Sequence, residues 1–147
     1  MAEFSVSRLR KHADYQRVYG SSRKQFSKQM SYFFSVRPEV GRDGRPLRVE
    51  NALIPRVGLT VGKVMGKAVD RNRIKRRLRE VVRRNVALLP RSTDVVLHPR
   101  RSVIDLDYLA LEREVAGVFR SIGRMVVREE RMREAAKLPV AGEASDA

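Results

Sequence analysis

The chain has 147 residues, of which 32 are basic and 17 acidic, so its formal net charge is +15. This length fits one domain with a modest core, and a hydrophobic fraction of 42% is sufficient for globular packing. The lack of cysteine excludes disulfides and thiolate metal sites. No apolar run is long enough to span a bilayer and the first residues do not resemble a signal peptide, which favours a cytoplasmic location.

The excess of positive charge indicates a polyanionic partner, either nucleic acid or an anionic membrane. Arginine supplies 25 of the 32 basic residues. Because its planar guanidinium binds phosphate bidentately and stacks on bases, this bias favours nucleic acid. A genome rich in G and C would produce the same arginine bias, but it would not explain the net charge.

The N-terminal third predicts a short helix followed by a strand. Residues 1–8 are expected to form a flexible arm, and residues 9–137 a single domain that binds nucleic acid. The helix covers 12–19, with Tyr15, Val18 and Tyr19 on one side at spacings of three and four. The strand covers 32–36; alternation places Tyr32, Phe34 and Val36 on one face and Phe33 and Ser35 on the other. A long loop is expected over 37–55.

A second strand is predicted over 57–62, with one apolar and one bare face. Val57, Leu59 and Val61 point one way, while Gly58, Thr60 and Gly62 are small and point the other. Such a bare face either packs closely against a helix or leaves a trough in which a chain can lie. Both alternatives stay open on the pattern alone.

A strongly basic helix is predicted over 70–86, with Asp70 as its N-cap. The core-facing stripe consists of Ile74, Leu78, Val81 and Val82, and the opposite face carries Asn72, Arg76, Arg79 and Arg83. From 71 to 84 there are eight basic residues and one acid. Like charges at i and i+4 cost about 0.2–0.5 kcal/mol each in an isolated helix. A charge run is often only a solvated face, but this density favours phosphates on the outer surface.

The C-terminal part predicts a short buried strand over 94–97 and a last helix. We expect Asp105 to cap this helix, which buries a stripe from Leu111 to Val126 and continues to about Lys137. Residues 138–147 are predicted to be a disordered tail.

The strand and basic helix together resemble the protein subunit of bacterial ribonuclease P. Its hallmark is an Arg-Asn-Arg motif that opens a basic helix after a Val-Gly-Leu-x-Val strand, and this chain has Arg71-Asn72-Arg73 after the strand that begins at Val57. The similarity extends over about residues 9–124. It implies an α+β single domain with a four-stranded sheet and packed helices, similar to ribosomal S5 domain 2, with a left-handed βαβ crossover through the basic helix.

The resemblance also implies a function and a set of binding residues. The family's ribonucleoprotein removes the 5′ leader from precursor tRNA, and its catalytic RNA holds the Mg²⁺ ions. The protein, one copy per RNA, would bind that RNA through Arg71, Asn72, Arg73, Lys75, Arg76, Arg79, Arg83 and Lys63. The single-stranded leader would lie in a cleft lined by Tyr15, Tyr19, Phe34 and Thr60. Aromatic side chains suit such a cleft because every base can stack on them. The alternative for Tyr15 and Tyr19 is simple packing of the first helix on the sheet.

No arrangement in the sequence predicts catalysis by the protein itself. His12 and His98 are the only histidines and nothing in their spacing brings them together, so a surface or capping role is expected for both. We therefore expect no catalytic residue and no metal held by the protein alone. Two other functions stay open: a ribosomal or ribosome-assembly protein, and a DNA-binding regulator with the basic helix in the major groove. Against the second, a row of arginines offers phosphate contacts but little variety for reading bases.

Overall fold

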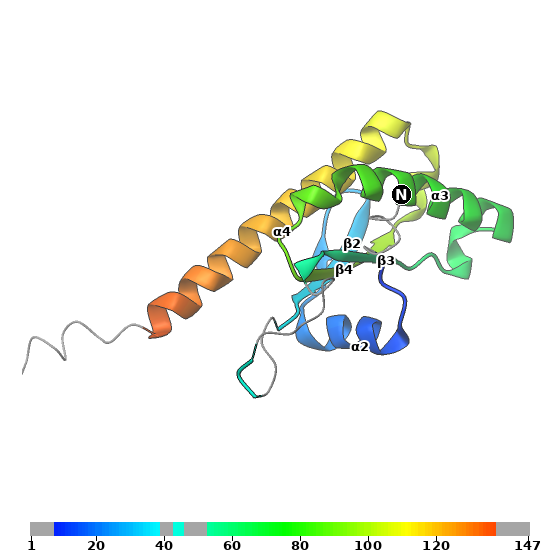
Figure 1. Cartoon of the computed structure of the whole chain (residues 1–147). Coiled ribbons are helices and arrows are strands. Elements are labelled where there is room, and N and C mark those ends of the chain that lie inside the picture. The colour runs from blue at the N-terminus through cyan, green and yellow to red at the C-terminus, as the bar shows by residue number, and fades with distance from the viewer. Residues whose placement is uncertain (1–7, 39–42, 46–52, 138–147) are drawn as a thin grey trace, which may run out of the picture.

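The computed structural model describes residues 8–38, 43–45 and 53–137, which form one four-stranded sheet covered by helices (Figure 1). The strands are β1 (Gln25–Phe26), β2 (Met30–Val36), β3 (Arg56–Leu59) and β4 (Thr93–Pro99). The α-helices are α2 (His12–Ser21), α3 (Ala68–Asn85) and α4 (Tyr108–Lys137). Three 3₁₀ turns connect them: η2 (Lys63–Met65), η3 (Val86–Leu88) and η4 (Arg101–Asp105). The predicted α+β class and four-stranded sheet are confirmed.

The sheet has the order β1-β2-β4-β3, so β3 lies at one edge. β2 pairs with β4 in the antiparallel sense, from Met30 opposite Pro99 to Val36 opposite Thr93. β3 pairs with β4 in the parallel sense, and α3 makes the crossover between them. Beyond β3, Arg8 forms a parallel bridge with Val57, and the Leu9 N–H donates to the Val57 carbonyl at 3.0 Å. The handedness of the crossover stays a prediction.

The helices lie on opposite faces of the sheet (Figure 1). α3 and α4 cover one face and enclose the main core, in which Leu78, Phe119 and Ile122 are buried against Val95 and Leu97 of β4. α2 covers the other face, where a smaller cluster forms from Leu9, Val18 and Val96, with Tyr15 and Phe33 packed against it. None of the helices described is long and apolar enough to cross a membrane.

Both predicted helix caps are displaced by two or three residues. α3 begins at Ala68, so Asp70 is at its third position rather than at the N-cap, and its carboxylate accepts the Lys67 N–H at 3.3 Å. α4 begins at Tyr108, and the carboxylate of Asp107, not Asp105, accepts the Ala110 N–H at 2.7 Å. The predicted end of α4 at Lys137 is confirmed. Of the predicted arm only Arg8 is described, and it lies beside the sheet; residues 1–7 and the tail at 138–147 lie outside the described residues.

A buried ion-pair cluster joins the sheet to α2. The fully buried carboxylate of Asp94 on β4 accepts two hydrogen bonds from Arg56, both at 2.8 Å, one from Arg17 at 2.5 Å and one from the buried Arg37. Asp14 of α2 adds contacts to Arg17 at 3.3 Å and to Arg56 at 3.4 Å. Burial lowers the pKa of Arg37 although Asp94 opposes this, whereas hydrogen bonding to Asp94 raises the pKa of Arg56. We name these five residues the Asp94 cluster.

Candidate nucleic-acid interface

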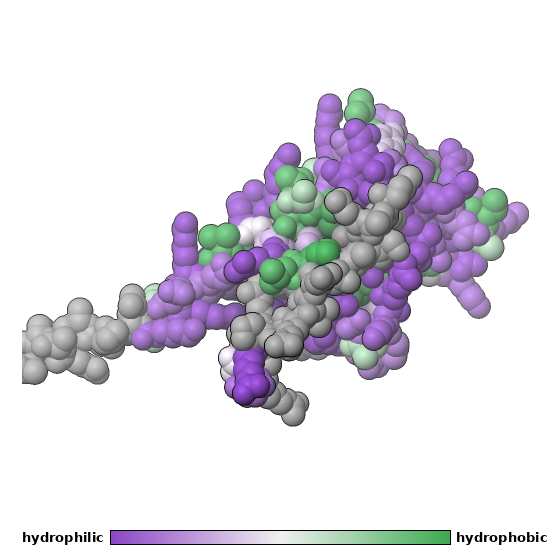
Figure 2. Space-filling view, in the orientation of Figure 1, coloured by the Kyte–Doolittle hydropathy of each residue, from purple (hydrophilic) through white to green (hydrophobic). Residues whose placement is uncertain are grey.

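The outer face of α3 presents the basic residues that the sequence predicts. Ile74, Leu78, Val81 and Val82 are buried, which confirms the predicted rotation of the helix. Asn72, Arg73 and Arg76 are consequently exposed, and Arg71, Lys75, Arg79 and Arg83 are partly exposed. Lys63 is exposed on η2, just before the helix. The visible surface over α3 is mostly hydrophilic (Figure 2).

The structure separates the basic side chains of α3 that have intramolecular partners from those that do not. Arg77 donates to the carbonyls of Ile104 at 3.4 Å and Leu106, and so fixes η4 to the helix. Arg83 forms an ion pair with Glu80 at 2.5 Å. By contrast, no described residue forms a hydrogen bond or ion pair with the side chains of Asn72, Arg73, Lys75 or Arg76. Because these groups are solvated and uncompensated, they are available to phosphates.

Tyr19 of α2 stands over the sheet in a cluster of aromatic and polar side chains. Its hydroxyl lies 3.0 Å from Nε2 of His98 and 3.4 Å from the hydroxyl of Thr60. Its ring meets the ring of Phe33 edge to face, with centroids 4.9 Å apart, and the ring of Tyr15 at 6.5 Å. The predicted group of Tyr15, Tyr19 and Thr60 is therefore brought together. We name Tyr19, Phe33, Thr60 and His98 the Tyr19 cluster.

Phe34 does not lie on this face, so its assignment to the cleft is wrong. It is buried in the main core under α3 and α4, together with Tyr32. Alternation along β2 puts Phe33, not Phe34, on the side covered by α2. The predicted alternation was correct; the choice of face was not, because the sequence does not say which face of the strand α2 covers.

Besides Phe33, His98 is a residue of the cluster that sequence reasoning missed. It lies on β4 two residues after Val96, which belongs to the α2 side of the sheet, so period-two alternation along this strand was the available signal. Burial, together with the charge of Lys24, lowers the pKa of His98. The imidazole is therefore neutral at physiological pH and can exchange a hydrogen bond with the Tyr19 hydroxyl.

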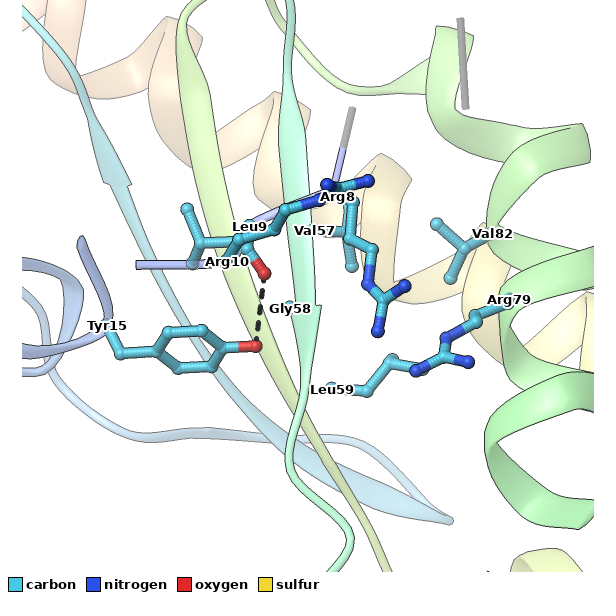
Figure 3. Close-up of a pocket in the computed structure, with 9 residues that line it drawn as sticks. All are labelled: Arg8, Leu9, Arg10, Tyr15, Val57, Gly58, Leu59, Arg79 and Val82. Carbon is cyan, nitrogen blue, oxygen red and sulfur yellow. Dashed lines mark hydrogen bonds between the residues drawn. The ribbon is translucent and has the colours of Figure 1, made fainter. Parts of the chain in front are cut away.

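A pocket lies at the β3 edge and is lined by residues of both α2 and α3 (Figure 3). It has a volume of about 430 Å³; Tyr15 enters from α2 on one side of β3 and Arg79 from α3 on the other, with Arg8 and Arg10 at its rim. Its nine lining residues include three arginines and no acid. Burial and the charge of Arg8 lower the pKa of Arg79, as expected where positive charges crowd together.

β3 ends at Leu59, so the strand predicted over 57–62 extends three residues too far. On its small-residue side Gly58 is closely packed, whereas an added Cβ at Gly62 would meet nothing within 4 Å. An added Cβ at Gly58 would lie only 2.4 Å from the Tyr15 hydroxyl, which itself donates to the Leu9 carbonyl at 3.4 Å. Burial raises the pKa of Tyr15. Tyr15 is thus both a packing residue and a wall of the pocket, whereas Tyr19 is 37% exposed.

Carboxylate and imidazole side chains do not gather in the part of the chain that the structure describes. No group of three or more histidine, aspartate or glutamate side chains comes together in the ranges that the structure covers. The one fully buried carboxylate among them, that of Asp94, is surrounded by arginines.

An α+β domain with a helix whose exposed face is basic is typical of the class of proteins that bind nucleic acid. The ribonuclease P family model matches residues 5–123. The ribonuclease P protein component of Syntrophus aciditrophicus is 32% identical over 123 residues, which cover 83% of this chain and 86% of that protein. The chain therefore belongs to the ribonuclease P protein family.

Other relatives and solved structures agree with this assignment. The protein component of Finegoldia magna is 45% identical over 65 residues, a shorter match that covers 44% of this chain and 58% of that protein. The ribonuclease P protein structure from Thermotoga maritima aligns with a TM-score of 0.61 at 24% identity, over 78% of this chain and 96% of that one. The structure of a Staphylococcus aureus ribonuclease P protein mutant aligns with a TM-score of 0.63 at 23% identity, over 82% of this chain and 90% of that one. At this identity the two structures show the same fold.

Proposed function

We propose that this protein works in the cytoplasm as the single protein subunit of a ribonuclease P particle, and helps its RNA remove the 5′ leader from precursor tRNA. The observation that carries the proposal is the pocket at the β3 edge. Arg79 of the basic helix and Tyr15 of α2 line the same pocket. A strand bound along the aromatic side chains would therefore reach the arginines of α3 without leaving the protein surface.

The exposed face of α3 would bind the catalytic RNA. Lys63 lies just before α3, and the other residues that would contact this RNA lie in the first half of the helix: Arg71, Asn72, Arg73, Lys75 and Arg76. Guanidinium and ammonium groups bind phosphate oxygens with little regard to sequence. We assign a smaller role to Arg83, since its ion pair with Glu80 competes with phosphate.

The leader would lie across the Tyr19 cluster and the pocket. Tyr19 offers a partly exposed ring on which a base can stack, and Thr60 and His98 beside it offer hydrogen bonds to the leader. Base stacking on an aromatic side chain contributes about 1–3 kcal/mol per base and is tolerant of sequence. This tolerance suits a protein that receives leaders of many sequences.

The hydrolytic step and its Mg²⁺ ions would belong to the RNA. The protein's contribution is to hold the leader and to neutralise phosphates where two RNA molecules approach each other. It would thereby favour productive binding of precursor over mature tRNA.

Cleavage of a 5′-extended precursor tRNA by a bacterial ribonuclease P RNA tests the proposal. The reaction is run at low magnesium with and without the protein. Strong stimulation with correct 5′ ends would support it. If the folded protein binds RNA without stimulating cleavage, the proposal is wrong, and ribosomal co-sedimentation would then test the ribosomal alternative.

A further inference from the structure

The α4 helix carries a second basic surface, which begins within the part shared with the family and continues beyond it. α4 is 30 residues long, and the family model ends at residue 123, within it. The second half of the helix projects beyond the sheet (Figure 1). Its outward face is therefore accessible from solvent over several turns.

Four arginines form a row on the side of α4 that faces away from the core. Arg113, Arg120, Arg124 and Arg131 follow one another at intervals of seven, four and seven residues, so they lie within about 40° of each other around the helix. The buried stripe, from Leu111 through Val118 to Val126, lies on the opposite side. All four arginines are exposed, and at 1.5 Å per residue the row is about 27 Å long. We name it the α4 arginine row.

The charge of this row is not compensated within the described structure. α4 also carries Glu129, Glu130 and Glu134, but no carboxylate of the described residues lies within 4.0 Å of these arginines. Among the residues that the structure describes, the row makes one hydrogen bond, which Arg124 donates to the Ser121 hydroxyl at 3.0 Å. Like charges four residues apart destabilise a helix unless anions neutralise them.

An apolar groove runs beside the row, between α4 and the segment after α3. It has a volume of about 940 Å³. Leu88, Pro90, Val127 and Met132 form its apolar part, and Arg120, Arg124, Arg128 and Arg131 also line it. Val127 is 43% and Met132 64% exposed, although both are large apolar side chains. Apolar surface flanked by arginines matches a nucleotide chain, whose bases can lie on the apolar part while the phosphates meet the guanidinium groups.

We propose that the α4 arginine row and this groove form a second RNA-binding surface, separate in sequence from the surface on α3. Its ligand is the phosphate backbone of an RNA segment with at least one unpaired base. The inference rests on the proposed function only for the identity of that RNA, which is either the ribonuclease P RNA or the precursor tRNA.

The salt dependence of RNA binding tests this surface. The variant Arg120→Ala/Arg124→Ala/Arg131→Ala removes three charges from the row, and the matched control Arg45→Ala/Arg101→Ala/Arg133→Ala removes three exposed charges elsewhere. Each lost phosphate contact should lower the slope of log K against log salt by roughly 0.7–0.9, so the row variant should lose about 2–3 relative to the control. Circular dichroism checks that α4 stays helical in both. The measurement is made separately with ribonuclease P RNA and with precursor tRNA, and the RNA that shows the loss is the ligand.

A proximity experiment uses the absence of cysteine from the chain. Ala135→Cys lies on the groove and Val64→Cys lies exposed before α3, so each accepts one tethered RNA-cleaving reagent. Cleavage of RNA by both labels, at different nucleotides, supports a second surface. Equal salt slopes for the row variant and its control, or RNA cleavage from the Val64 label alone, would overturn the proposal of a second RNA-binding surface. A protein partner would then be the alternative ligand of the groove. The processing assay is independent of both readouts, so a protein that fails to stimulate cleavage but shows the slope loss refutes the proposed function only.

Discussion

Replacing Asp94 with asparagine should destabilise the protein more than any surface change. The substitution keeps the shape of the side chain but removes the negative charge of a carboxylate that forms an ion pair with Arg37, which is 9% exposed. Removing one partner of a buried ion pair costs about 3–5 kcal/mol, because the remaining charge stays buried. Arg56 and Arg17, at 23% and 42% exposure, can turn toward solvent and should add little. We therefore expect a loss of about 3–5 kcal/mol in the free energy of unfolding.

Urea unfolding without RNA, at fixed ionic strength, measures this loss. With an m-value of about 2 kcal/mol/M, the midpoint should fall by about 2 M. Arg17→Ala is the matched control: it removes the most exposed arginine of the Asp94 cluster and should cost less than about 1 kcal/mol. If Asp94→Asn costs no more than this control, Arg37 does not depend on Asp94 for its burial, and the reasoning fails.

Three further predictions test the binding surfaces and the burial of His98. Arg76→Ala should lower the salt slope of RNA binding by roughly 0.7–0.9, while Arg77→Ala should leave the slope unchanged and lower the unfolding midpoint; the opposite pattern would contradict their assigned contacts. Gly58→Ala should displace the Tyr15 ring and lower the free energy of unfolding by about 1–3 kcal/mol through overpacking. It should also weaken the binding of precursor tRNA more than the binding of mature tRNA; equal losses of affinity would make Tyr15 a packing residue only. Because the pKa of His98 is lowered on folding, its neutral form stabilises the protein above its ordinary pKa of about 6.5, and this contribution is lost as the pH falls. The wild type should consequently lose more stability than His98→Gln between pH 7.5 and 5.5, and equal losses in urea unfolding would count against the burial of His98.

The sequence predicted well those features that depend on local periodicity. The core stripe of α3 and its exposed basic face follow from the 3.6-residue repeat, and alternation correctly divided β2 into two faces. Helix caps were less well placed. Two aspartates stand near the start of α4, and only the geometry shows that Asp107 is the residue that accepts the Ala110 N–H. At α3 the N-cap is Lys67, a residue type that does not mark a helix start.

Features that depend on tertiary contacts were missed for a physical reason. Tyr19 and His98 are 79 residues apart, and Arg37 and Asp94 are 57 apart, so no local pattern relates them. The same limit explains the error at Phe34. Which face of β2 meets α2 is decided by how the helix packs on the sheet, and the strand itself has aromatic residues on both faces.

The bridge between Arg8 and Val57 should reduce self-association of the protein through the edge of its sheet. An exposed sheet edge is a template on which another chain can add a strand, and this is a common route to aggregation. Here the β3 edge is only four residues long and is partly occupied by Arg8 and Leu9, and β1, at the opposite edge, has two residues. Several copies bound close together on RNA would therefore offer one another little unpaired backbone at their sheet edges. Arg8 and Leu9, which cover part of the β3 edge, also line the pocket beside it.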